Sequence, residues 1–440
     1  MIDMKRLVII LLGTCLLLSA CASGSSESSK DVSGEKKTVT ISVTMKDRFL
    51  ETAALKFEET HPNINIEFKE NLSLPSGAGD GAIDLNKYVQ TVTTEALAGN
   101  ASDIIAMGYL PVDKFVQKNM LVDLYGLMSK DSAFDKNQYY KKIMEASQTG
   151  DGLYAMPVSF STSAMQGKSD LLEKANVSIN DTSWTWDDFK NITLKVNEKA
   201  DSDYSGMISA FPEQMLYDFI EENYSELVQP EEHKAKFDSK MFIDKMKQVK
   251  SMYDEGILSN GELTDLDKGL FTDLNLSSPK ESLTQLLNPN TLLLRKPTES
   301  GTFRGGSFNS YSTFGINSKS KVQQEAWEFI KFLLSEDMQS SPEMSGLPLN
   351  KAVTEKELNS VKQQIQDGQI ELPDGSDEKL LDERIDLLKT FLEETGVNIE
   401  GDMKIKSFAL EELRTYMSGQ KSAEEVSNLL QNRVMTYLNE

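Results

Sequence analysis

The side chains that most often do chemistry in proteins are few here, and they are poorly placed for it. His61 and His233 are the only histidines among the 440 residues, and each lies beside a helix or turn signal, far from the other in sequence. A zinc site built on histidines needs more than one of them close together, and a Ser-His-Asp triad needs a histidine beside a nucleophile. The sequence favours neither site, and we expect both histidines to be solvated or helix-capping residues.

Acidic side chains are abundant, and several stand next to each other. A pair of carboxylates is what hydrolysis of a glycosidic bond requires. The doublets in this chain are Asp187 with Asp188, Glu221 with Glu222, and Glu393 with Glu394. Because the chain has 69 acidic residues, such doublets are expected on exposed helix faces. We therefore predict that the protein is not an enzyme, and keep a surface hydrolase as the alternative.

Ligand patterns for metals and nucleotides are incomplete. One calcium-loop frame has its first, third, fifth and twelfth positions at Asp84, Asn86, Tyr88 and Glu95. Its sixth position, where the turn demands glycine, is Val89. The segment FRGGSF at 303–308 lacks the glycine spacing of a phosphate-binding loop. We predict neither a metal site nor a cofactor.

Both cysteines of the chain, Cys15 and Cys21, lie near its start. Lys5 and Arg6 precede an uncharged, mostly aliphatic run at 7–18, an order typical of a secretion signal. The run is shorter than the roughly 20 residues that cross a bilayer. The sequence LSAC that ends at Cys21 resembles the lipobox of bacterial lipoproteins. That resemblance implies cleavage before Cys21 and lipid attached to its sulfur, whereas a plain secretion signal or a short membrane anchor would leave the thiol unmodified.

The composition indicates an exported globular body on a tether. Residues 21–37 are rich in serine, glycine and charge, so we expect a lipidated cysteine and a flexible tether there, after a signal peptide at 1–20. The net charge of −23 argues against nucleic acid or an anionic membrane surface as a partner. With 39% hydrophobic and 26% charged residues, the remainder is typical of a folded protein, and it is long enough for more than one domain.

Strands alternate with helices after the tether. TVTISVT at 38–44 is a β-branched run, INIEF at 64–68 alternates as a half-buried strand does, and DIIAM at 103–107 is a short apolar strand. Helices are expected between them, one ended by Pro62 and one at about 84–97. This alternation predicts an α/β fold with a mainly parallel sheet and helices on both faces.

Two irregular segments interrupt the alternation, and the last helix carries a clear start signal. Pro157 lies inside an expected strand, which implies a sheet edge or a change of sheet. Gly305 and Gly306 begin a second segment, rich in small polar residues. Ser422 and Glu425 predict a capping box at the start of the final helix. The buried face of that helix is expected at Val426, Leu429, Leu430, Val434 and Tyr437.

Seven segments occur in an order that amphipathic packing alone does not explain. They are the lipobox, VTISVT with ETAALKFEETHPNINIEF, GNASDIIAM, DGLYAMPVSFSTSAM, SWTWDDFK, EAWEFIKFLLSEDMQ with GLPLNK, and GQKSAEEVSNLLQNRVMTYLNE. Together they resemble the extracellular solute-binding proteins of ABC importers, the carbohydrate-associated family that includes maltose-binding protein.

The resemblance implies a two-lobed, type II periplasmic-binding-protein-like fold. Each lobe is expected to be a mainly parallel sheet flanked by helices, with hinge crossovers joining the lobes and solute held in the cleft. The crossovers are expected near Pro157, near Gly305 and Gly306, and near 346–348. The N-terminal lobe would then be 38–155 plus 311–345, and the C-terminal lobe 156–310 plus 346–440.

Loops that leave strands toward the cleft are the candidates for solute contact, because ligands bind beyond the carboxyl ends of strands in open α/β sheets. Sugars need aromatic faces for stacking and polar side chains for their hydroxyls. The candidates are Lys46, Asp47, Arg48, Tyr109, Phe160, Ser161, Ser163, Phe211, Arg304, Phe308 and Tyr311. Lys46, Arg48 and Arg304 would together form a basic spot that suits an acidic solute such as a uronate-bearing sugar. The tryptophans Trp184, Trp186 and Trp327 are expected to be packing residues.

The function implied by the resemblance is that of the membrane-anchored substrate-binding component of an ABC importer. We expect a monomer, held by the lipid on Cys21 at the extracellular face of a bacterial membrane. It would bind a mono- or oligosaccharide and deliver it to separate permease subunits. A non-sugar polar solute, such as a peptide or a polyol phosphate, is the alternative within this class. A surface lipoprotein hydrolase and an adhesin or scaffold are the alternatives outside it.

Overall fold

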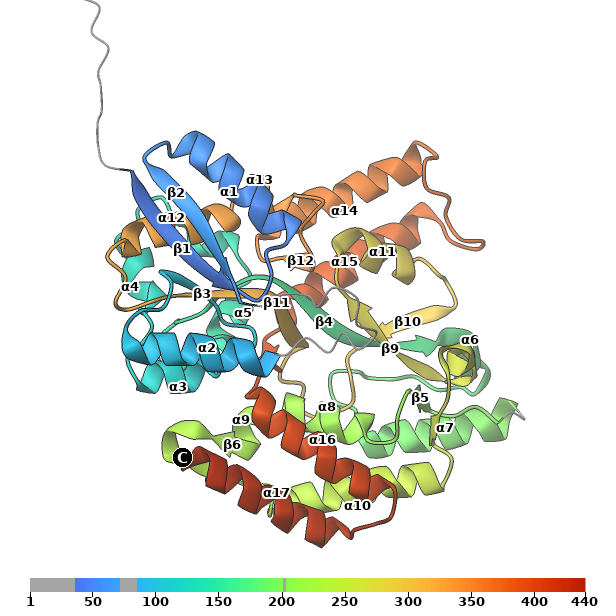
Figure 1. Ribbon diagram of the computed structural model, residues 1–440. Helices are drawn as coiled ribbons and strands as arrows, with labels where there is room; N and C mark the ends of the chain where they lie inside the picture. Colours follow the sequence, from blue (N-terminus) through green and yellow to red (C-terminus); the bar gives the residue numbers. More distant parts are fainter. Residues whose placement is uncertain (1–35, 72–84, 201–202, 440) are drawn as a thin grey trace, which may run out of the picture. The chain divides into compact units, whose positions relative to one another are not determined.

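The computed structural model describes residues 36–71, 85–200 and 203–439, which belong to one compact unit, Lys36–Glu440 (Figure 1). The predicted signal peptide, Cys15, Cys21 and nearly all of the predicted tether lie outside the described residues, as does Asp84. The strands are β1 (Lys37–Val43), β2 (Ile64–Glu70), β3 (Ile104–Ala106), β4 (Met156–Lys168), β5 (Met207–Ser209), β6 (Val228–Gln229), β7 (Lys234–Ala235), β8 (Leu258–Asn260), β9 (Phe271–Leu276), β10 (Thr291–Leu294), β11 (Ser307–Ile316), β12 (Leu347–Pro348) and β13 (Val397–Asn398).

The α-helices are α1 (Arg48–Thr60), α2 (Leu85–Ala98), α3 (Val112–Gln117), α4 (Leu124–Met128), α5 (Lys141–Ala146), α6 (Ser169–Lys174), α7 (Trp186–Ala200), α8 (Gln214–Glu222), α9 (Tyr224–Leu227), α10 (Lys240–Asp254), α11 (Pro279–Leu286), α12 (Gln323–Leu333), α13 (Glu336–Gln339), α14 (Lys351–Gln366), α15 (Glu378–Glu394), α16 (Met403–Met417) and α17 (Ala423–Leu438). Short 3-10 helices are η1 (Lys136–Gln138), η2 (Pro230–Glu232) and η3 (Leu263–Lys268). No helix in the described part of the chain is both long enough and apolar enough to cross a membrane.

The main sheet has the strand order β10-β4-β11-β3-β1-β2, with β9 and β12 paired to β4 and β13 paired to β11. β1 is parallel to β2 and β3, and β5 is parallel to β8 in a separate small sheet. All pairings of β4 are antiparallel, and so is that of β11 with β3. The prediction of mainly parallel sheets is therefore right for β1, β2, β3, β5 and β8 and wrong around β4. The alternation of strands and helices along the sequence indicates only how neighbouring elements are connected. The partners of β4 lie far along the chain, so the alternation does not indicate their direction.

Pro157 lies near the start of β4, opposite Thr313 of β11. The register of this pairing shifts beside it, between Ser310 and Thr313. At Pro157 the strand is paired only with β11, since the β12 and β9 pairings begin at Ser159 and later. Proline cannot donate a ladder hydrogen bond and is tolerated at such an open side or irregularity. Farther along, β4 pairs with β9 and β10 in place of β11 and β12.

The helix that follows β1 shows how local sequence fixes its own ends. The Asp47 carboxylate accepts the N–H of Leu50 and caps α1. At the other end, His61 is the C-cap, and its ring stacks on Phe57 with the centroids 4.0 Å apart. His233 likewise follows η2 as its C-cap, with ring Nδ1 2.6 Å from the Leu438 carbonyl oxygen. Both histidines are thus helix-capping residues, one of the two roles expected for them.

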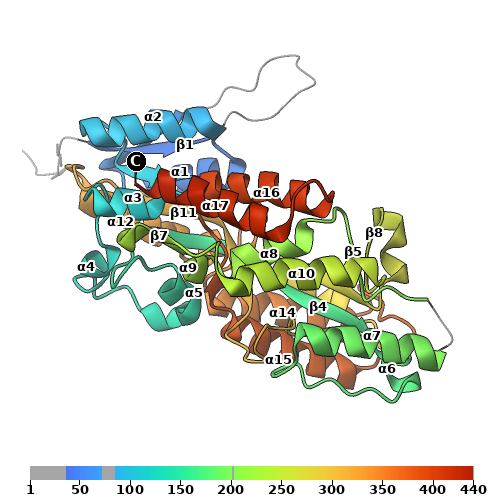
Figure 2. The ribbon, with the colours of Figure 1, turned by 90° about the horizontal axis from the view of Figure 1, so that it is seen from below.

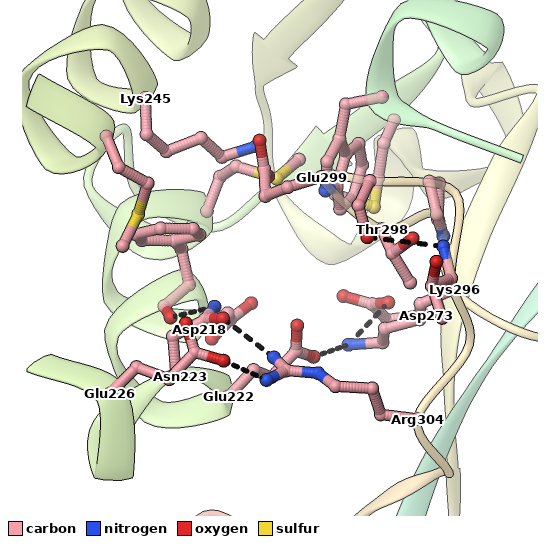
Figure 3. A pocket seen from close by; sticks show the side chains of 18 residues that line it. Asp218, Glu222, Asn223, Glu226, Lys245, Asp273, Lys296, Thr298, Glu299 and Arg304 are labelled. Carbon is pink, nitrogen blue, oxygen red and sulfur yellow. Dashed lines mark hydrogen bonds and ion pairs between the residues drawn. The ribbon is translucent and has the colours of Figure 1, made fainter.

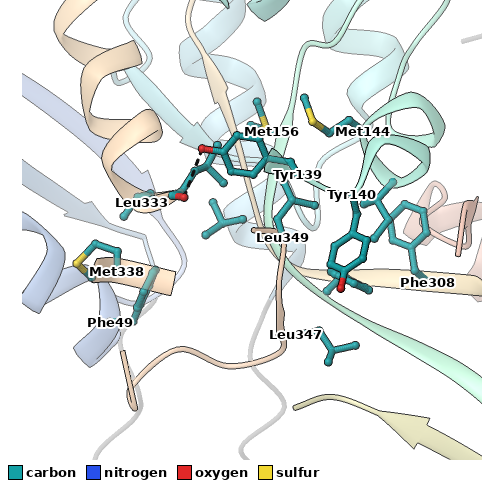
Figure 4. Close-up of a cluster of buried hydrophobic side chains, with 14 of the residues drawn as sticks. Phe49, Tyr139, Tyr140, Met144, Met156, Phe308, Leu333, Met338, Leu347 and Leu349 are labelled. Carbon is teal, nitrogen blue, oxygen red and sulfur yellow. Dashed lines mark hydrogen bonds between the residues drawn. The ribbon is translucent and has the colours of Figure 1, made fainter. Parts of the chain in front are cut away.

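Buried apolar side chains form three clusters. The first joins β1, α1, β4 and α12 with α11, α14 and α15, and Figure 4 shows part of it. The second joins α7, α8, α10, α16 and α17, and the third lies between α2, β3 and α3. Trp327 is fully buried in the first cluster and Trp184 and Trp186 are buried in the second, which confirms that all three are packing residues.

The final helix begins with the predicted capping box: the Ser422 hydroxyl accepts the N–H of Glu425, whose carboxylate accepts the N–H of Ser422 at 2.8 Å. Replacing Ser422 with alanine is expected to lower the free energy of unfolding by about 1 kcal/mol, because a helix amide loses its partner. Urea unfolding measures this change. The Ser422 hydroxyl also donates to the Glu425 carboxylate at 2.9 Å. Ser422→Thr, which keeps both the acceptor and the donor, should restore most of the loss, and an equal loss in both variants would contradict the capping role.

Candidate functional site

One hollow in the described part of the chain combines aromatic and polar side chains and has a volume of about 1000 Å³. We call it the cleft cavity. The side chains that define it are Gln90 of α2, Tyr109 and Pro111 after β3, Asp402, Lys404 and Phe408 of α16 with its N-cap, and Asn432, Arg433 and Tyr437 of α17. Figures 1 and 2 show α2 on one side of this region and the adjacent helices α16 and α17 on the other.

The two walls of the cleft cavity belong to different apolar cores. α2 and the segment around Tyr109 pack into the third cluster through Tyr88, Val92 and Leu110. α16 and α17 pack into the second cluster through Ile405 and Val434. Each wall is therefore anchored in its own core.

The chemical character of the walls suits a polyhydroxylated solute. Tyr109 is 42% exposed, and Phe408 and Tyr437 meet edge to face with their centroids 6.2 Å apart. Gln90 and Asn432 add planar amides. Aromatic surfaces beside planar hydrogen-bonding groups are what sugar rings and their hydroxyls require.

Asp402 fixes the geometry of one wall. Its carboxylate accepts the Tyr437 hydroxyl at 2.7 Å and the N–H of Lys404 at 2.8 Å. Its own N–H donates to the Tyr224 hydroxyl at 3.0 Å. Burial raises the pKa of Tyr224 well above its usual range, so this phenol stays neutral. Through its carboxylate and its backbone N–H, Asp402 thus ties α9, α16 and α17 together at the cavity wall.

A second hollow, the charged cavity, has a volume of about 410 Å³ and lies among α8, α10, β9 and the 296–304 loop (Figure 3). Lys296 Nζ lies 3.2 Å from Asp273 and 3.8 Å from Glu222. Lys245, whose side chain is 2% exposed, pairs with Glu299 at 2.6 Å. Arg304 pairs with Glu226 and donates to Asn223. Among the described residues, every cation that lines this cavity has a carboxylate partner, and the five carboxylates of the lining outnumber its three cations.

The pKa values of the groups in the charged cavity are shifted by burial and by the closeness of the other charges. Burial, reinforced by the nearby carboxylates of Asp273 and Glu222, raises the pKa of Asp218 to about 7. Burial opposes the charge on Lys296, but Asp273 and Glu222 outweigh it and raise the pKa of that amine. The pairs therefore hold their own charges in place, and we take the cleft cavity as the candidate solute site. Within the described residues, no three His, Cys, Asp or Glu side chains cluster as metal ligands.

The structure places the predicted contacts in several different environments. Tyr109 lines the cleft cavity. Phe211 and Tyr311 are exposed at 41% and 50% but lie outside the lining of that cavity. Ser161 is half-buried in β4, opposite Asn309, and Ser163 bonds to the Ser307 hydroxyl at 3.1 Å.

Two of the predicted contacts are core residues. Phe160 and Phe308 are fully buried and pack edge to face, 6.4 Å apart. Neither ring has a face open to solute in this conformation. Each phenylalanine has polar residues directly before and after it in its strand. The sequence alone did not reveal which face of β4 and β11 is covered by other parts of the protein.

Two of the three cations in the predicted basic spot, Lys46 and Arg304, are paired with carboxylates. Lys46 pairs with Glu51 at 2.9 Å and Arg304 with Glu226. Asp47 is used as the helix cap, and Arg48 begins α1 as an exposed residue. Local pairing on α1 and within the charged cavity thus neutralises the amine and guanidinium of Lys46 and Arg304.

The residues of α16 and α17 in the cleft cavity were missed. The hydrophobic stripe of a helix shows which side packs inward, but it does not show what the other side faces. Tyr437 was assigned to the buried stripe of the last helix, as was Leu429, which is 39% exposed. The available signal was a pair of aromatic residues next to buried positions: Phe408 precedes Ala409 on α16, and Tyr437 precedes Leu438 on α17.

Comparison with known proteins places the chain in a family. Residues 42–340 match the family described as bacterial extracellular solute-binding protein. The chain belongs to this family. Its predicted fold class, the type II periplasmic-binding-protein-like fold, is confirmed by the solved structures that it resembles.

Three of these structures cover nearly the whole of both chains. An extracellular solute-binding protein of family 1 from Alicyclobacillus acidocaldarius matches with TM-score 0.59 and 16% identity over 93% of this chain and 100% of that one. A periplasmic oligogalacturonide-binding protein from Yersinia enterocolitica matches with TM-score 0.59 and 15% identity over 91% and 99%. An ABC substrate-binding protein from Listeria monocytogenes, solved with cycloalternan, matches with TM-score 0.55 and 16% identity over 92% and 99%. At these identities the likeness concerns the fold.

Proposed function

We propose that this family member is the substrate-binding component of an ABC importer and that it holds a carbohydrate in the cleft cavity. The observation that carries the proposal is a hollow of about 1000 Å³ whose aromatic and amide-bearing walls are anchored in separate cores. This is the upper end of the usual size of ligand pockets, so an oligosaccharide fits. Support comes from structural relatives that are described with cycloalternan and with oligogalacturonide.

The working cycle is a closure of two lobes over the solute. The N-terminal lobe is 38–155 plus 311–345 and the C-terminal lobe is 156–310 plus 346–440. In this proposal the crossovers lie near Pro157, Gly305 and Gly346, and the pairing of β4 with β11 and β12 supports it because it brings these segments side by side. Gly305 and Gly346 take positive φ values of 129° and 94° beside these strands, a backbone that favours glycine.

The protein works at the outer face of the cell membrane as a monomer. The lipid is carried on Cys21 and the tether at 21–37 lets the body reach a permease, which supplies the transmembrane path. This chain catalyses no reaction. The supporting features are the lipobox-like LSAC sequence and the match to an extracellular family.

Thermal unfolding of the protein in the presence of each member of a panel of mono- and oligosaccharides tests the proposal. A ligand at 100 times its dissociation constant adds about 2.7 kcal/mol to stability, so a true solute raises the midpoint clearly. A midpoint raised by peptides or polyol phosphates and by no saccharide would overturn the carbohydrate assignment. Release of saccharide fragments on incubation would favour the hydrolase.

Tyr109→Ala is expected to weaken binding of the saccharide found in this panel about tenfold, because an accessible ring in the cavity wall is lost. Calorimetry measures the change. Tyr311→Ala is the matched control, since Tyr311 is also exposed, at 50%, but does not line the cavity. Equal losses in the two variants would contradict the location of the site.

A further inference from the structure

Two of the aromatic rings in the cleft cavity, those of Phe408 and Tyr437, are covered by cations. Lys114 Nζ of α3 lies 3.6 Å from the centroid of the Tyr437 ring. Over Phe408, the guanidinium carbon of Arg433 is at 4.4 Å and Lys404 Nζ is at 5.3 Å. Each distance falls within the range of a cation–π interaction. A neutral sugar that came to stack on Phe408 or Tyr437 would compete with ammonium or guanidinium groups already placed there.

These cations differ in how far protein carboxylates neutralise them. Arg433 is satisfied by Glu411 at 2.8 Å and Glu412 at 2.7 Å. Lys404 and Lys114, in contrast, form no ion pair with any of the described residues. This differs from the charged cavity, where every lining cation is paired.

The one carboxylate in the described lining of the cleft cavity, that of Asp402, is already hydrogen-bonded within the protein. Its oxygens accept the Tyr437 hydroxyl and the N–H of Lys404. Because Asp402 caps α16, an incoming anion would meet the Lys404 ammonium and not the helix amides. An exposed cation of this kind inside a site of a protein with net charge −23 attracts an anion by complementarity.

We infer that the solute is an acidic carbohydrate, with a carboxylate that pairs with Lys404 at the cavity wall and with Lys114 at its rim. This inference rests on the proposed carbohydrate-binding function. The carboxylate approaches the ammonium groups while both cations keep their place over the rings, so charge pairing takes over the role that ring stacking has for a neutral sugar. Charge-assisted hydrogen bonds of this type are stronger than neutral ones. Lys404 is thus the residue that sets the preference for acidic over neutral sugars.

Calorimetric titration with a trimer of galacturonic acid and with the neutral trimer of galactose tests the inference on the wild-type chain. We expect the acidic trimer to bind at least about tenfold more tightly. Its affinity should fall as salt is added, because exposed charge pairs are screened. If the neutral trimer binds as well or better, the acidic preference is wrong and carbohydrate binding stands. If no saccharide of any kind binds, the proposed function itself fails.

Two variants test whether Lys404 causes the preference for the acidic trimer. Lys404→Gln is expected to weaken binding of the acidic trimer about tenfold while it leaves the neutral trimer unchanged. Lys280→Gln is the control, because Lys280 is an exposed lysine of α11 outside the cavity. An equal loss for both trimers in Lys404→Gln would show a structural role and overturn the assignment, as would no loss for either.

Discussion

Replacing Arg295 with methionine is expected to lower the free energy of unfolding by about 3 to 5 kcal/mol. The Arg295 side chain is 13% exposed, and its guanidinium binds two carboxylates. Its Nη1 lies 3.1 Å from both oxygens of Asp181, and its Nε and Nη2 lie 2.8 Å and 2.6 Å from Glu394. Methionine fills much of the volume but leaves Glu394 without its cation and Asp181 with only the backbone N–H of residue 295, at 2.9 Å. Carboxylates stripped of their cation in a half-buried site are the costly outcome.

Urea unfolding of three variants separates the causes. Arg295→Lys keeps the charge but cannot reach both carboxylates with a planar fork, so we expect an intermediate loss. Lys240→Met is the matched control, because it breaks an i,i+4 pair with Asp244 in which Lys240 is 87% exposed. Such exposed pairs contribute little, about 0.3 to 0.5 kcal/mol. A loss for Arg295→Met no larger than that of the control would contradict the role of the buried fork.

Gly305→Ala is expected to cost about 2 to 4 kcal/mol, since two penalties combine at this position. Its φ of 129° lies in a region that residues with a Cβ rarely adopt, which costs about 1 to 3 kcal/mol. In addition, a Cβ on Gly305 would lie 2.7 Å from the backbone oxygen of Glu394. A backbone oxygen at the end of α15 cannot rotate away as a side chain does, so the loop before β11 must shift.

Gly368→Ala isolates the first of these penalties. Gly368 has a φ of 70° and a Cβ there would meet no atom within 4 Å, so only the backbone strain, about 1 kcal/mol, is expected. Both variants are compared by urea unfolding and by saccharide affinity. Equal stability losses would show that the approach to Glu394 is unimportant.

Much of the local structure followed from the sequence. The β-branched run of β1, the apolar face of α1 and the capping box of Ser422 all act over a few residues, so their patterns are complete in the sequence. The antiparallel pairings of β4 did not follow, because they join Phe160 to Leu347 and Thr162 to Leu276, positions that no local pattern relates.

The candidate site was harder to predict than the fold. Tyr109 was predicted because it follows a strand, and it lines the cleft cavity. Lys404 and Phe408 were not predicted. They lie on a helix, α16, and the sequence of a helix does not show which other part of the protein its outer face meets. Lys46 looked available as a cation, but a glutamate five residues away neutralises it. The pairing state of a charged side chain is a property of the folded chain, and it decides which cations remain for a solute.

The change of partners along β4 has a mechanical consequence for the proposed closure. One continuous strand is held by β11 and β12 near its start and by β9 and β10 near its end. A rotation between these two regions must twist the strand, because it has no loop at the midpoint that could swing freely. A strand that is twisted on closure stores elastic energy and gives it back when the twist is released. The strand would therefore favour one degree of opening of the cleft cavity. The empty protein would return to that opening after the solute leaves, without any energy source of its own.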